Sequence, residues 1–454
     1  MLGVNNFIWI IFKRFFIMVL NFPIQIRKRS TKTFIGILLA LLFMYTFFAM
    51  RSDYHYIAMR EVTDDHALSV HKATVAKFYK ARQSWSTSVL GTRLFKPNEE
   101  SMETIQQSKI FTILVWKYWD WLKKRHVMAY GEGKNNPLKD CSVKNCLFTG
   151  ADDLLETADA VIIHLQHGIV PKSNHRPPQQ RWIFLSDESP KNSFSLAKNS
   201  VNLKDFANVF NWSMTFRSDS DIPVPYGRTV ALETPFFKYL KQTTITEIIP
   251  NWKKKRRDVI ATILISNCSV KFRMKFLTEL QKHIPVDIYG NCSQNTTLKH
   301  SCPGHFRSDC EPISKYLFYL TLENSNCQEY LTEKIWHHAY GKGAIPVIMG
   351  PSIKDCKKLL PPNSYLHIPL ANTPNQVKKL AMTMLRISKS DGEIASLHNW
   401  RNHFKVVNEH GYFATQSKHL CRVCEAMNYN NPEQKIYTIE NLLRYFDPKL
   451  TCDK

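Results

Sequence analysis

The chain has 454 residues, 44% of them hydrophobic, and a formal net charge of +23. This length allows two or three domains with substantial cores. The charge would suit nucleic acid, an anionic membrane surface or a negatively charged small substrate. The basic residues are scattered, however, and no zinc-finger spacing, aromatic RNA-binding strand motif or basic helix is found, so no nucleic-acid partner is expected.

The N-terminal region predicts a membrane anchor. Residues 34–50 form an uncharged apolar run, which is at the short end for crossing a bilayer, and basic residues at 27–32 precede it. Cations on this side place residues 1–33 in the cytosol and the rest of the chain in a lumen. A cleaved signal peptide is the alternative, but the run begins late and lacks a small-residue cleavage site. We therefore expect an uncleaved signal-anchor and a type II protein.

Residues 51–105 carry charged and polar residues with no sustained apolar period, and we interpret them as a stem. The alternative is a long amphipathic helix that includes residues 66–82. Beyond residue 109 short apolar strands alternate with helical or loop segments, which is typical of parallel sheets covered on both faces. The predicted strands are 110–116, 160–165, 182–186, 259–266, 286–289, 317–322 and 344–349.

This alternation predicts an α/β protein with two Rossmann-like domains that face a cleft. An exposed basic connector at 252–257 separates them. The first domain is expected at 106–245 and the second at 255–385. C-terminal helices and a Cys-x-x-Cys segment follow at 386–454.

The predicted strand 182–186 is followed by two carboxylates, Asp187 and Glu188. Functional groups of α/β folds gather at the C-terminal edge of the strands. Neighbouring side chains of an extended chain point to opposite sides, so one of the two can face the cleft, and we favour Glu188. A carboxylate there can remove the proton of an attacking hydroxyl group, and burial would suit it to that task.

Two basic residues, Arg273 and Lys275, lie where the strand 259–266 gives way to a helix. The N-terminal end of a helix favours anions. An arginine can bind phosphate oxygens through two parallel hydrogen bonds, which a lysine cannot do. Both residues are candidates for phosphate binding, and plain surface charge is the alternative for each.

The most informative stretch runs from residue 320 to 350. Its pattern predicts the end of a strand, a polar turn, a helix over 330–342, a stop at Gly343 and a buried strand. Tyr330, Glu333 and Lys334 stand at i, i+3 and i+4, so they share one side of the first helical turn. With the free N–H groups of a helix start they suit a diphosphate. A solvated Glu/Lys pair is the alternative.

This stretch resembles the donor-binding motif of the α1,3-fucosyltransferases (glycosyltransferase family 10), which move fucose from GDP-fucose to glycan acceptors. The family pattern is Phe-x-Glu-Asn-Ser, a spacer, Tyr-(Val/Ile)-Thr-Glu-Lys, and a Pro-Val strand ending in Gly-Pro. A second stretch, 210–227, is similar to the family's Tyr-Arg-Arg-Asp-Ser-Asp-Ile-x-Val-Pro-Tyr-Gly. The matching residues of the first motif are Leu322, Glu323, Asn324, Ser325, Tyr330, Leu331, Thr332, Glu333, Lys334, Pro346, Val347, Gly350 and Pro351.

The resemblance, over residues 110–425, implies a GT-B-like fold and an inverting α1,3-fucosyltransferase. It places Glu188, within Glu-Ser-Pro, at the family's general base. Arg273 corresponds to a phosphate-binding arginine and Lys275 to another basic position. The donor-binding residues that the resemblance and the helix pattern together predict are Arg273, Lys275, Asn324, Tyr330, Glu333 and Lys334.

The resemblance also implies the partners: GDP-fucose as donor, a glycoprotein or glycolipid glycan containing GlcNAc as acceptor, and a Golgi membrane location. No cofactor is expected to be required. Asp219 and Asp221 have the letters of a metal motif but belong to the loop 210–227, so a divalent cation is expected to be dispensable, with stimulation left open. The run 164–167 departs from the family's His-His motif. The usual N-acetyllactosamine acceptor is therefore in doubt, and chitobiose-core, LacdiNAc-type or protein-linked acceptors remain open.

All eleven cysteines follow residue 140, which suits an oxidising compartment that leaves one thiol unpaired. A four-thiolate zinc site is the alternative for the pairs Cys141/Cys146 and Cys421/Cys424. The family joins its C-terminal Cys-x-x-Cys to early cysteines, which favours disulfides with open connectivity. Of the four glycosylation sequons, Asn267 is expected to stay unmodified because it adjoins the nucleotide, and the other three are expected to carry glycans: Asn211, Asn291 and Asn295.

Two other function classes remain open at this stage. One is a different nucleotide-sugar transferase of the same architecture, which competition by UDP or CMP rather than GDP would indicate. The other is an inactive membrane-anchored glycan-binding protein. The joint presence of Glu188, Arg273 and Lys334 counts against the second class.

Overall fold

The computed structural model describes residues 42, 44–46, 65–97, 109–128, 136–236, 244–304, 306–433 and 435–452. The chain divides into two units, residues 1–66 and 67–454, and every element named below belongs to the second unit. Nearly all of the predicted tail and anchor lies outside the described residues. Among the helices that are described, none has the length and apolar character needed to cross a bilayer.

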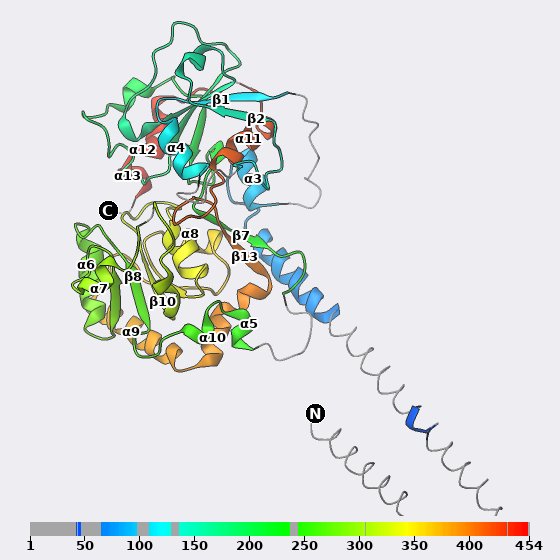
Figure 1. The fold of residues 1–454 in the computed structure, drawn as a ribbon, viewed down its shortest axis with the longest axis vertical. Coiled ribbons are helices and arrows are strands. Elements are labelled where there is room, and N and C mark those ends of the chain that lie inside the picture. The colour runs from blue at the N-terminus through cyan, green and yellow to red at the C-terminus, as the bar shows by residue number, and fades with distance from the viewer. Residues whose placement is uncertain are drawn as a thin grey trace, which may run out of the picture. The chain divides into compact units, whose positions relative to one another are not determined.

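The first sheet of the described chain has six parallel strands in the order β2-β1-β3-β4-β5-β6 (Figure 1). Every residue of β3 and β4 is buried. Such strands are covered on both faces, which is why they read as apolar runs in the sequence. The bounds are β1 Phe111–Val115, β2 Cys146–Thr149, β3 Ala160–His164, β4 Arg181–Ser186, β5 Trp212–Thr215 and β6 Ile222–Pro223.

The second sheet has five parallel strands in the order β12-β11-β10-β8-β9. Its core includes apolar residues of helices α6 (Lys271–Gln281), α9 (Pro374–Ser388) and α10 (Asp391–His398). The strand bounds are β8 Ala261–Leu264, β9 Val286–Tyr289, β10 Phe318–Leu322, β11 Ile345–Met349 and β12 Leu366–His367. The two parallel sheets confirm the predicted α/β class.

The C-terminal segment returns to the first sheet. Helix α11 (His419–Tyr429) packs into a core with β1, β3 and β4, and α12 (Ile439–Phe446) packs on the other face of the same strands. Figure 1 shows these helices, in red, beside β1. An antiparallel pair, β7 (Gly227–Ala231) and β13 (Phe404–Asn408), also joins early and late parts of the chain.

The remaining helices are short. Their bounds are α3 Val89–Phe95, α4 Trp119–His126, η2 Asp152–Glu156, η3 Leu165–His167, η4 Leu203–Phe206, α5 Ile245–Ile248, η5 Trp252–Lys254, α7 Thr296–His300, η6 Glu311–Lys315, η7 Lys334–Tyr340, α8 Ile353–Leu359, η8 Asn399–Asn402 and α13 Pro448–Thr451.

Two sequence-based expectations differ from the structure. Part of the predicted stem, residues 67–97, is folded: residues 67–80 are helical, and Phe78, Trp85 and Phe95 are buried against Tyr226 and Phe404. The helical alternative describes these residues better, because their aromatic side chains have a core to enter.

The basic run 252–257 is also not a free connector. Lys255 Nζ donates to the carbonyls of Tyr316 and Lys342, and Arg256 pairs with Asp287. The run is thus packed against the second sheet by these contacts.

Candidate active site

A cavity of about 460 Å³ brings together residues from both sheets. Glu188 and Tyr226 enter it from the segments that follow β4 and β6 of the first sheet, and Arg273 and Lys334 from the helices α6 and η7 that follow β8 and β10 of the second. Six of the seven residues predicted for catalysis or donor binding line it: Glu188, Arg273, Asn324, Tyr330, Glu333 and Lys334.

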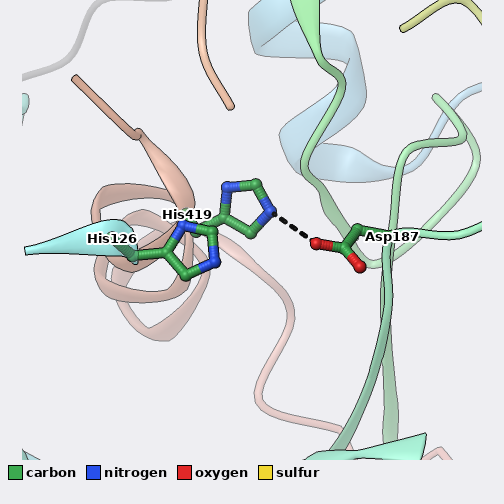
Figure 2. A group of neighbouring side chains, drawn as sticks. All are labelled: His126, Asp187 and His419. Atoms are coloured by element: carbon green, nitrogen blue, oxygen red, sulfur yellow. Dashed lines mark ion pairs between the residues drawn. The ribbon is translucent and has the colours of Figure 1, made fainter. Parts of the chain in front are cut away.

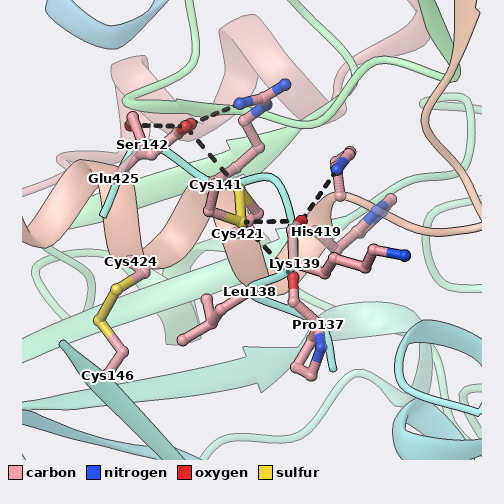
Figure 3. The surroundings of a disulfide bond; sticks show 12 residues. Pro137, Leu138, Lys139, Cys141, Ser142, Cys146, His419, Cys421, Cys424 and Glu425 are labelled. Atoms are coloured by element: carbon pink, nitrogen blue, oxygen red, sulfur yellow. Dashed lines mark hydrogen bonds and ion pairs between the residues drawn. A yellow bond between two sulfur atoms is a disulfide. The ribbon is translucent and has the colours of Figure 1, made fainter. Parts of the chain in front are cut away.

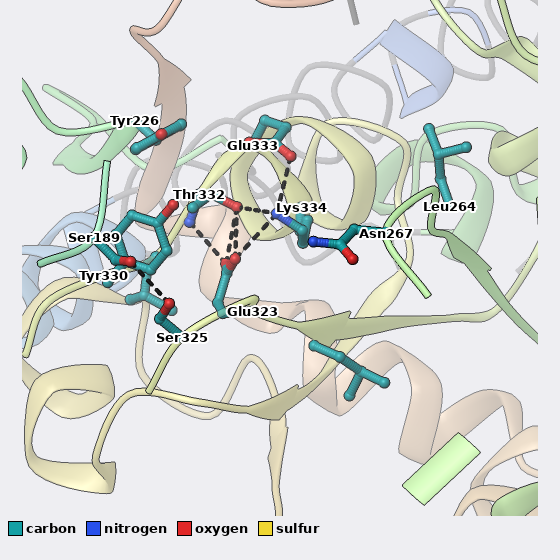
Figure 4. Close-up of polar contacts among 12 residues, drawn as sticks. Ser189, Tyr226, Leu264, Asn267, Glu323, Ser325, Tyr330, Thr332, Glu333 and Lys334 are labelled. Carbon is teal, nitrogen blue, oxygen red and sulfur yellow. Dashed lines mark hydrogen bonds and ion pairs between the residues drawn. The ribbon is translucent and has the colours of Figure 1, made fainter. Parts of the chain in front are cut away.

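The centre of the donor motif is a buried network around Lys334 (Figure 4). Its Nζ lies 3.1 Å from Glu323 Oε2 and 3.0 Å from Glu333 Oε1. Thr332 donates its N–H and its hydroxyl to the fully buried Glu323. Burial alone would lower the pKa of Lys334, but the two carboxylates raise it above its ordinary value. The ammonium therefore stays charged and fixed.

The helix of this motif begins later than expected. The prediction was 330–342, whereas the π-helix η7 spans Lys334–Tyr340. Glu329 adopts a positive φ of 58°, and Cys327 just before it is bonded to Cys452. The Thr332 N–H also binds Glu323 instead of a helical carbonyl. Tyr330 therefore reaches the cavity from a loop, not from the first helical turn.

Arg273 and Lys275 have different surroundings although both are on α6. Arg273 is buried and donates from Nη1 to the carbonyl of Leu322 and from Nη2 to that of Asn267. Its Nε has no hydrogen-bond partner among the residues that the structure describes. Lys275 is exposed and does not line the cavity. Two residues along a helix is a rotation of about 200°, so both could not face the same site. The expected donor role of Lys275 is therefore not supported by its position.

Glu188 is the carboxylate that faces the cavity. The hydroxyl of Tyr330 donates to Glu188 Oε2 over 3.2 Å. This hydrogen bond joins the segment after β10 of the second sheet to the segment after β4 of the first. Burial, with the negative charge of Asp187 next to it, raises the pKa of Glu188 to about 7. A base works best when its pKa is near the working pH, so the position and the pKa both suit proton abstraction.

Asp187 faces away from the cavity, as the alternation of an extended chain predicts. Arg125 Nη1 lies 3.0 Å from Asp187 Oδ2. Figure 2 shows His419 approaching the same carboxylate, with the ring of His126 stacked beside it. Although burial favours the protonated acid, Arg125 and His410 hold the pKa of Asp187 well below its ordinary value.

Direct contacts join the two halves of the site. Ser189 of the Glu-Ser-Pro motif donates to Ser325 Oγ of the Glu-Asn-Ser motif over 2.8 Å (Figure 4). Sequence reasoning missed other residues of the lining: some come from segments with no motif, and some, such as His338, lie inside the stretch 320–350 but were not singled out. They include Ser266, Lys299, His300, His338, Tyr412 and Phe413.

The predicted glycosylation sites fall into different environments. Asn211 is buried: its Oδ1 accepts from the Trp182 N–H and its Nδ2 donates to the Lys435 carbonyl. A glycan there would break this pairing, so the burial of Asn211 does not support the expectation that it carries one. Asn267 and Asn291 both line the cavity. Asn295 caps α7 through its Oδ1, accepting from Thr297 and Leu298 N–H groups on an exposed surface.

The paired cysteines settle the choice between disulfides and zinc. Cys141 is bonded to Cys421 and Cys146 to Cys424, which attaches α11 to the first sheet (Figure 3). Three further disulfides and a buried free thiol complete the set: Cys268–Cys292, Cys302–Cys310, Cys327–Cys452 and Cys356.

The two carboxylates of the Asp-Ser-Asp stretch are engaged within the protein. Asp219 pairs with Arg217, and Asp221 accepts from the Ser213 N–H and pairs with Lys435. These contacts hold the loop together.

Family models match most of the folded chain. A model described as fucosyltransferase, N-terminal, matches residues 108–227, and one described as glycosyltransferase family 10 (fucosyltransferase) C-term matches residues 252–442. The chain belongs to glycosyltransferase family 10. As a member of this fucosyltransferase family it is a glycosyltransferase.

Similar proteins carry fucosyltransferase names. Alpha-(1,3)-fucosyltransferase 7 of Rattus norvegicus is 27% identical, with 74% of this chain and 79% of that protein aligned. The 4-galactosyl-N-acetylglucosaminide 3-alpha-L-fucosyltransferase 9 of Homo sapiens is 26% identical, with 84% and 94% aligned. A crystal structure of alpha1,3-fucosyltransferase with GDP-fucose is a structural neighbour with a TM-score of 0.43, 15% identity and coverage of 77% and 97%.

Proposed function

We propose that this family 10 enzyme is an inverting α1,3-fucosyltransferase, which moves L-fucose from GDP-fucose to a hydroxyl group of a GlcNAc-containing glycan. The observation that carries the proposal is that Glu188 faces the same cavity as Arg273 and Lys334. One carboxylate able to accept a proton thus stands across from cations able to face a diphosphate. The names of the similar proteins support fucose as the sugar and the 3-position as the linkage.

The reaction follows from these positions. Glu188 takes the proton of the acceptor hydroxyl while the oxygen of that hydroxyl forms a bond to fucose C1. At the same time the bond from C1 to the diphosphate breaks, and its electron pair leaves with GDP. Attack opposite the leaving group inverts C1. Arg273 and Lys334 would offset the charge that grows on the diphosphate, which is the kind of stabilisation that dominates many enzymatic rate enhancements.

The surroundings of Lys334 refine this assignment. Glu323 and Glu333 already balance its charge, so its ammonium is held in one place before any ligand binds. Preorganised charges avoid reorganisation during the reaction. Arg273 Nε and Asn324 Oδ1, which lack a hydrogen-bond partner within the described part of the chain, are further polar groups at this site. No step of the scheme needs a metal ion.

The location and acceptor belong to the same proposal. A type II protein of the Golgi membrane, anchored at 34–50, would have its catalytic part in an oxidising lumen, and the five disulfides support such a compartment. A glycoprotein or glycolipid glycan would be the acceptor. The departure of residues 164–167 from the family's acceptor motif favours an acceptor other than N-acetyllactosamine.

Assay of the purified full chain with GDP-fucose against a glycan array tests the function. We expect fucose transfer to GlcNAc-containing glycans, with competition by GDP and not by UDP or CMP. Calorimetry should detect GDP binding. Absence of GDP binding in folded protein would overturn the proposal.

A further inference from the structure

Asp187 lies in a buried cluster behind Glu188 that the proposed reaction does not use. Its carboxylate meets Arg125 of α4, and both side chains are nearly inaccessible, at 4% and 2% exposure. His410 Nε2 from the C-terminal segment lies 3.4 Å from the same oxygen, Oδ2. Nε2 of His164, at the end of β3, lies 4.0 Å from the other carboxylate oxygen, Oδ1.

Four histidines surround this ion pair and are held neutral. Burial lowers the pKa of each, to about 4 for His164 and His410 and well below the ordinary value for His126 and His419. At neutral pH the cluster therefore contains one positive and one negative charge. His126, Asp187 and His419 are residue types that bind metals, but Arg125 already places a cation on that carboxylate. The cluster is thus charge-compensated without a metal.

The same cluster holds the strand end that carries Glu188. The hydroxyl of Tyr226 donates to the main-chain carbonyl of Asp187 over 2.9 Å. The ring of Tyr226 in turn stacks on His410, with centroids 3.7 Å apart and planes 9° from parallel. Tyr330 holds the carboxylate of Glu188 itself. The dipeptide is thus fixed at the Asp187 side chain, the Asp187 carbonyl and the Glu188 carboxylate.

We propose that Arg125, Asp187 and His410 are positioning residues for Glu188: they fix the end of β4 so that Glu188 faces the donor cavity, and the fixed negative charge of Asp187 behind it makes Glu188 a stronger base. This inference rests on the proposed role of Glu188 as general base. None of the three residues lines the cavity, so they act through Glu188 and do not touch the substrates.

The charged and titratable groups around Glu188 support a measurable effect on its protonation. Beyond burial, Asp187 raises the pKa of Glu188, and Tyr330, Arg125 and Lys334 lower it, with the Asp187 contribution the largest of these four. The buried phenols Tyr226 and Tyr412 have raised pKa values and are neutral at the working pH. Removing Asp187 and Arg125 together should therefore lower the pKa of Glu188.

The test is the double variant Arg125→Met/Asp187→Asn of the full chain. Removal of one partner alone would leave a buried charge unpaired, whereas removal of both is often nearly neutral for folding. We expect GDP affinity within about threefold of wild type, a plateau kcat lower by about tenfold because the base is weaker and less well held, and an acidic limb of the kcat profile at lower pH. Arg125→Lys, which keeps the charge, should retain the wild-type limb.

A matched control is Arg217→Met/Asp219→Asn, which removes an Arg–Asp pair elsewhere in the same part of the chain. It should leave the acidic limb in place. An unmoved limb in the Arg125/Asp187 double variant, in protein that binds GDP normally, contradicts the positioning role. So does a parallel loss of kcat and GDP affinity, because that pattern indicates general structural damage.

Glu188→Gln measured in parallel separates the two proposals. If it transfers fucose normally, the general-base assignment fails and the positioning role fails with it. If it is inactive while the Arg125/Asp187 double variant keeps a wild-type acidic limb, only the positioning role fails.

Discussion

A buried cation pairs with carboxylate groups on each side of the cavity, but the two arrangements have different effects on ionisation. On the donor side Lys334 contacts two carboxylates, Glu323 and Glu333, so the lysine is kept charged. Behind the other side Arg125 forms an ion pair with one carboxylate, that of Asp187. The negative charge of Asp187 raises the pKa of the neighbouring Glu188. Similar buried ion pairs thus have different effects: one keeps Lys334 ionised, and the other favours the protonated form of Glu188.

The largest effect is expected at Glu188. Glu188→Gln should lower kcat by about 10³-fold, because an amide cannot take the proton of the acceptor. GDP affinity should stay within about threefold, since the change lies across the cavity from the cations. Glu433→Gln, which alters an exposed carboxylate, is the control and should behave as wild type. Normal transfer by Glu188→Gln would remove the functional contrast between the two sides.

The donor side should respond in binding. Lys334→Ala should weaken GDP binding by about 10- to 100-fold, the range expected for loss of a charge-assisted contact to phosphate. Calorimetry measures the effect. Because Glu323 would be left buried and unpaired, Lys334→Met/Glu323→Gln should be measured as well. If that double variant is folded and binds GDP as wild type does, Lys334 has no part in donor binding.

The pH profile sharpens the contrast at Glu188. With a pKa near 7, Glu188 is protonated in acid and cannot act as a base. Transfer should therefore fall by about tenfold per pH unit below that value and level off above it. GDP binding should change much less over the same range, because Lys334 stays charged. A rate limb near pH 4.5 would show that Glu188 behaves as an ordinary carboxylate.

Stability gives an independent measure of the same shift. A carboxyl whose pKa is raised by folding stabilises the protein fully below its unfolded pKa, and this contribution is lost as the pH rises through about 7. Glu188→Gln cannot ionise and should gain on the order of 1–3 kcal/mol relative to wild type at pH 8, with a smaller difference at pH 5. Thermal unfolding at both values measures it. Equal differences at the two values would argue against the shift.

The smallest effect is expected at Lys275. Its side chain is exposed and outside the cavity, so Lys275→Ala should change GDP affinity by less than about twofold. Arg273→Lys, on the same helix, should weaken binding by more, because a lysine cannot reproduce the fork of an arginine. Calorimetry of GDP binding by both variants shows whether Lys275 contacts the donor or is only close to Arg273 in sequence. If both variants lost GDP affinity equally, Lys275 would be a donor-binding residue after all.

Much of the fold was predictable because parallel strands covered on both faces read as apolar runs. All seven predicted strands occur within two residues of their expected bounds, as for β9, which spans Val286–Tyr289. The missed strands lack a continuous apolar run: β5 (Trp212–Thr215) is buried throughout but alternates with the polar residues Ser213 and Thr215, and β7 and β13 are only partly buried. Strand β2 (Cys146–Thr149) has a single buried residue, and β6 and β12 have two residues each.

The cavity was predictable where a motif carries its residues, and not where tertiary contacts decide. Glu188 and Lys334 lie in motifs, whereas the lining residue Tyr412 comes from a segment with no motif, as do Arg125 and His410 in the cluster behind Glu188. The segment before the late start of η7 contains the bond between Cys327 and Cys452, a long-range contact that no local pattern contains. Asn211 matches a sequon, but its side-chain amide oxygen accepts from the main-chain N–H of Trp182 in β4.

The bonds of Cys141 and Cys421 and of Cys146 and Cys424 also bear on how the chain is made. They close covalent rings spanning 280 and 278 residues, and the whole second sheet lies inside those rings. During synthesis the strands of the first sheet leave the ribosome long before α11 exists to cover them. The second sheet can complete itself in that interval, so the half of the enzyme that begins first should mature last.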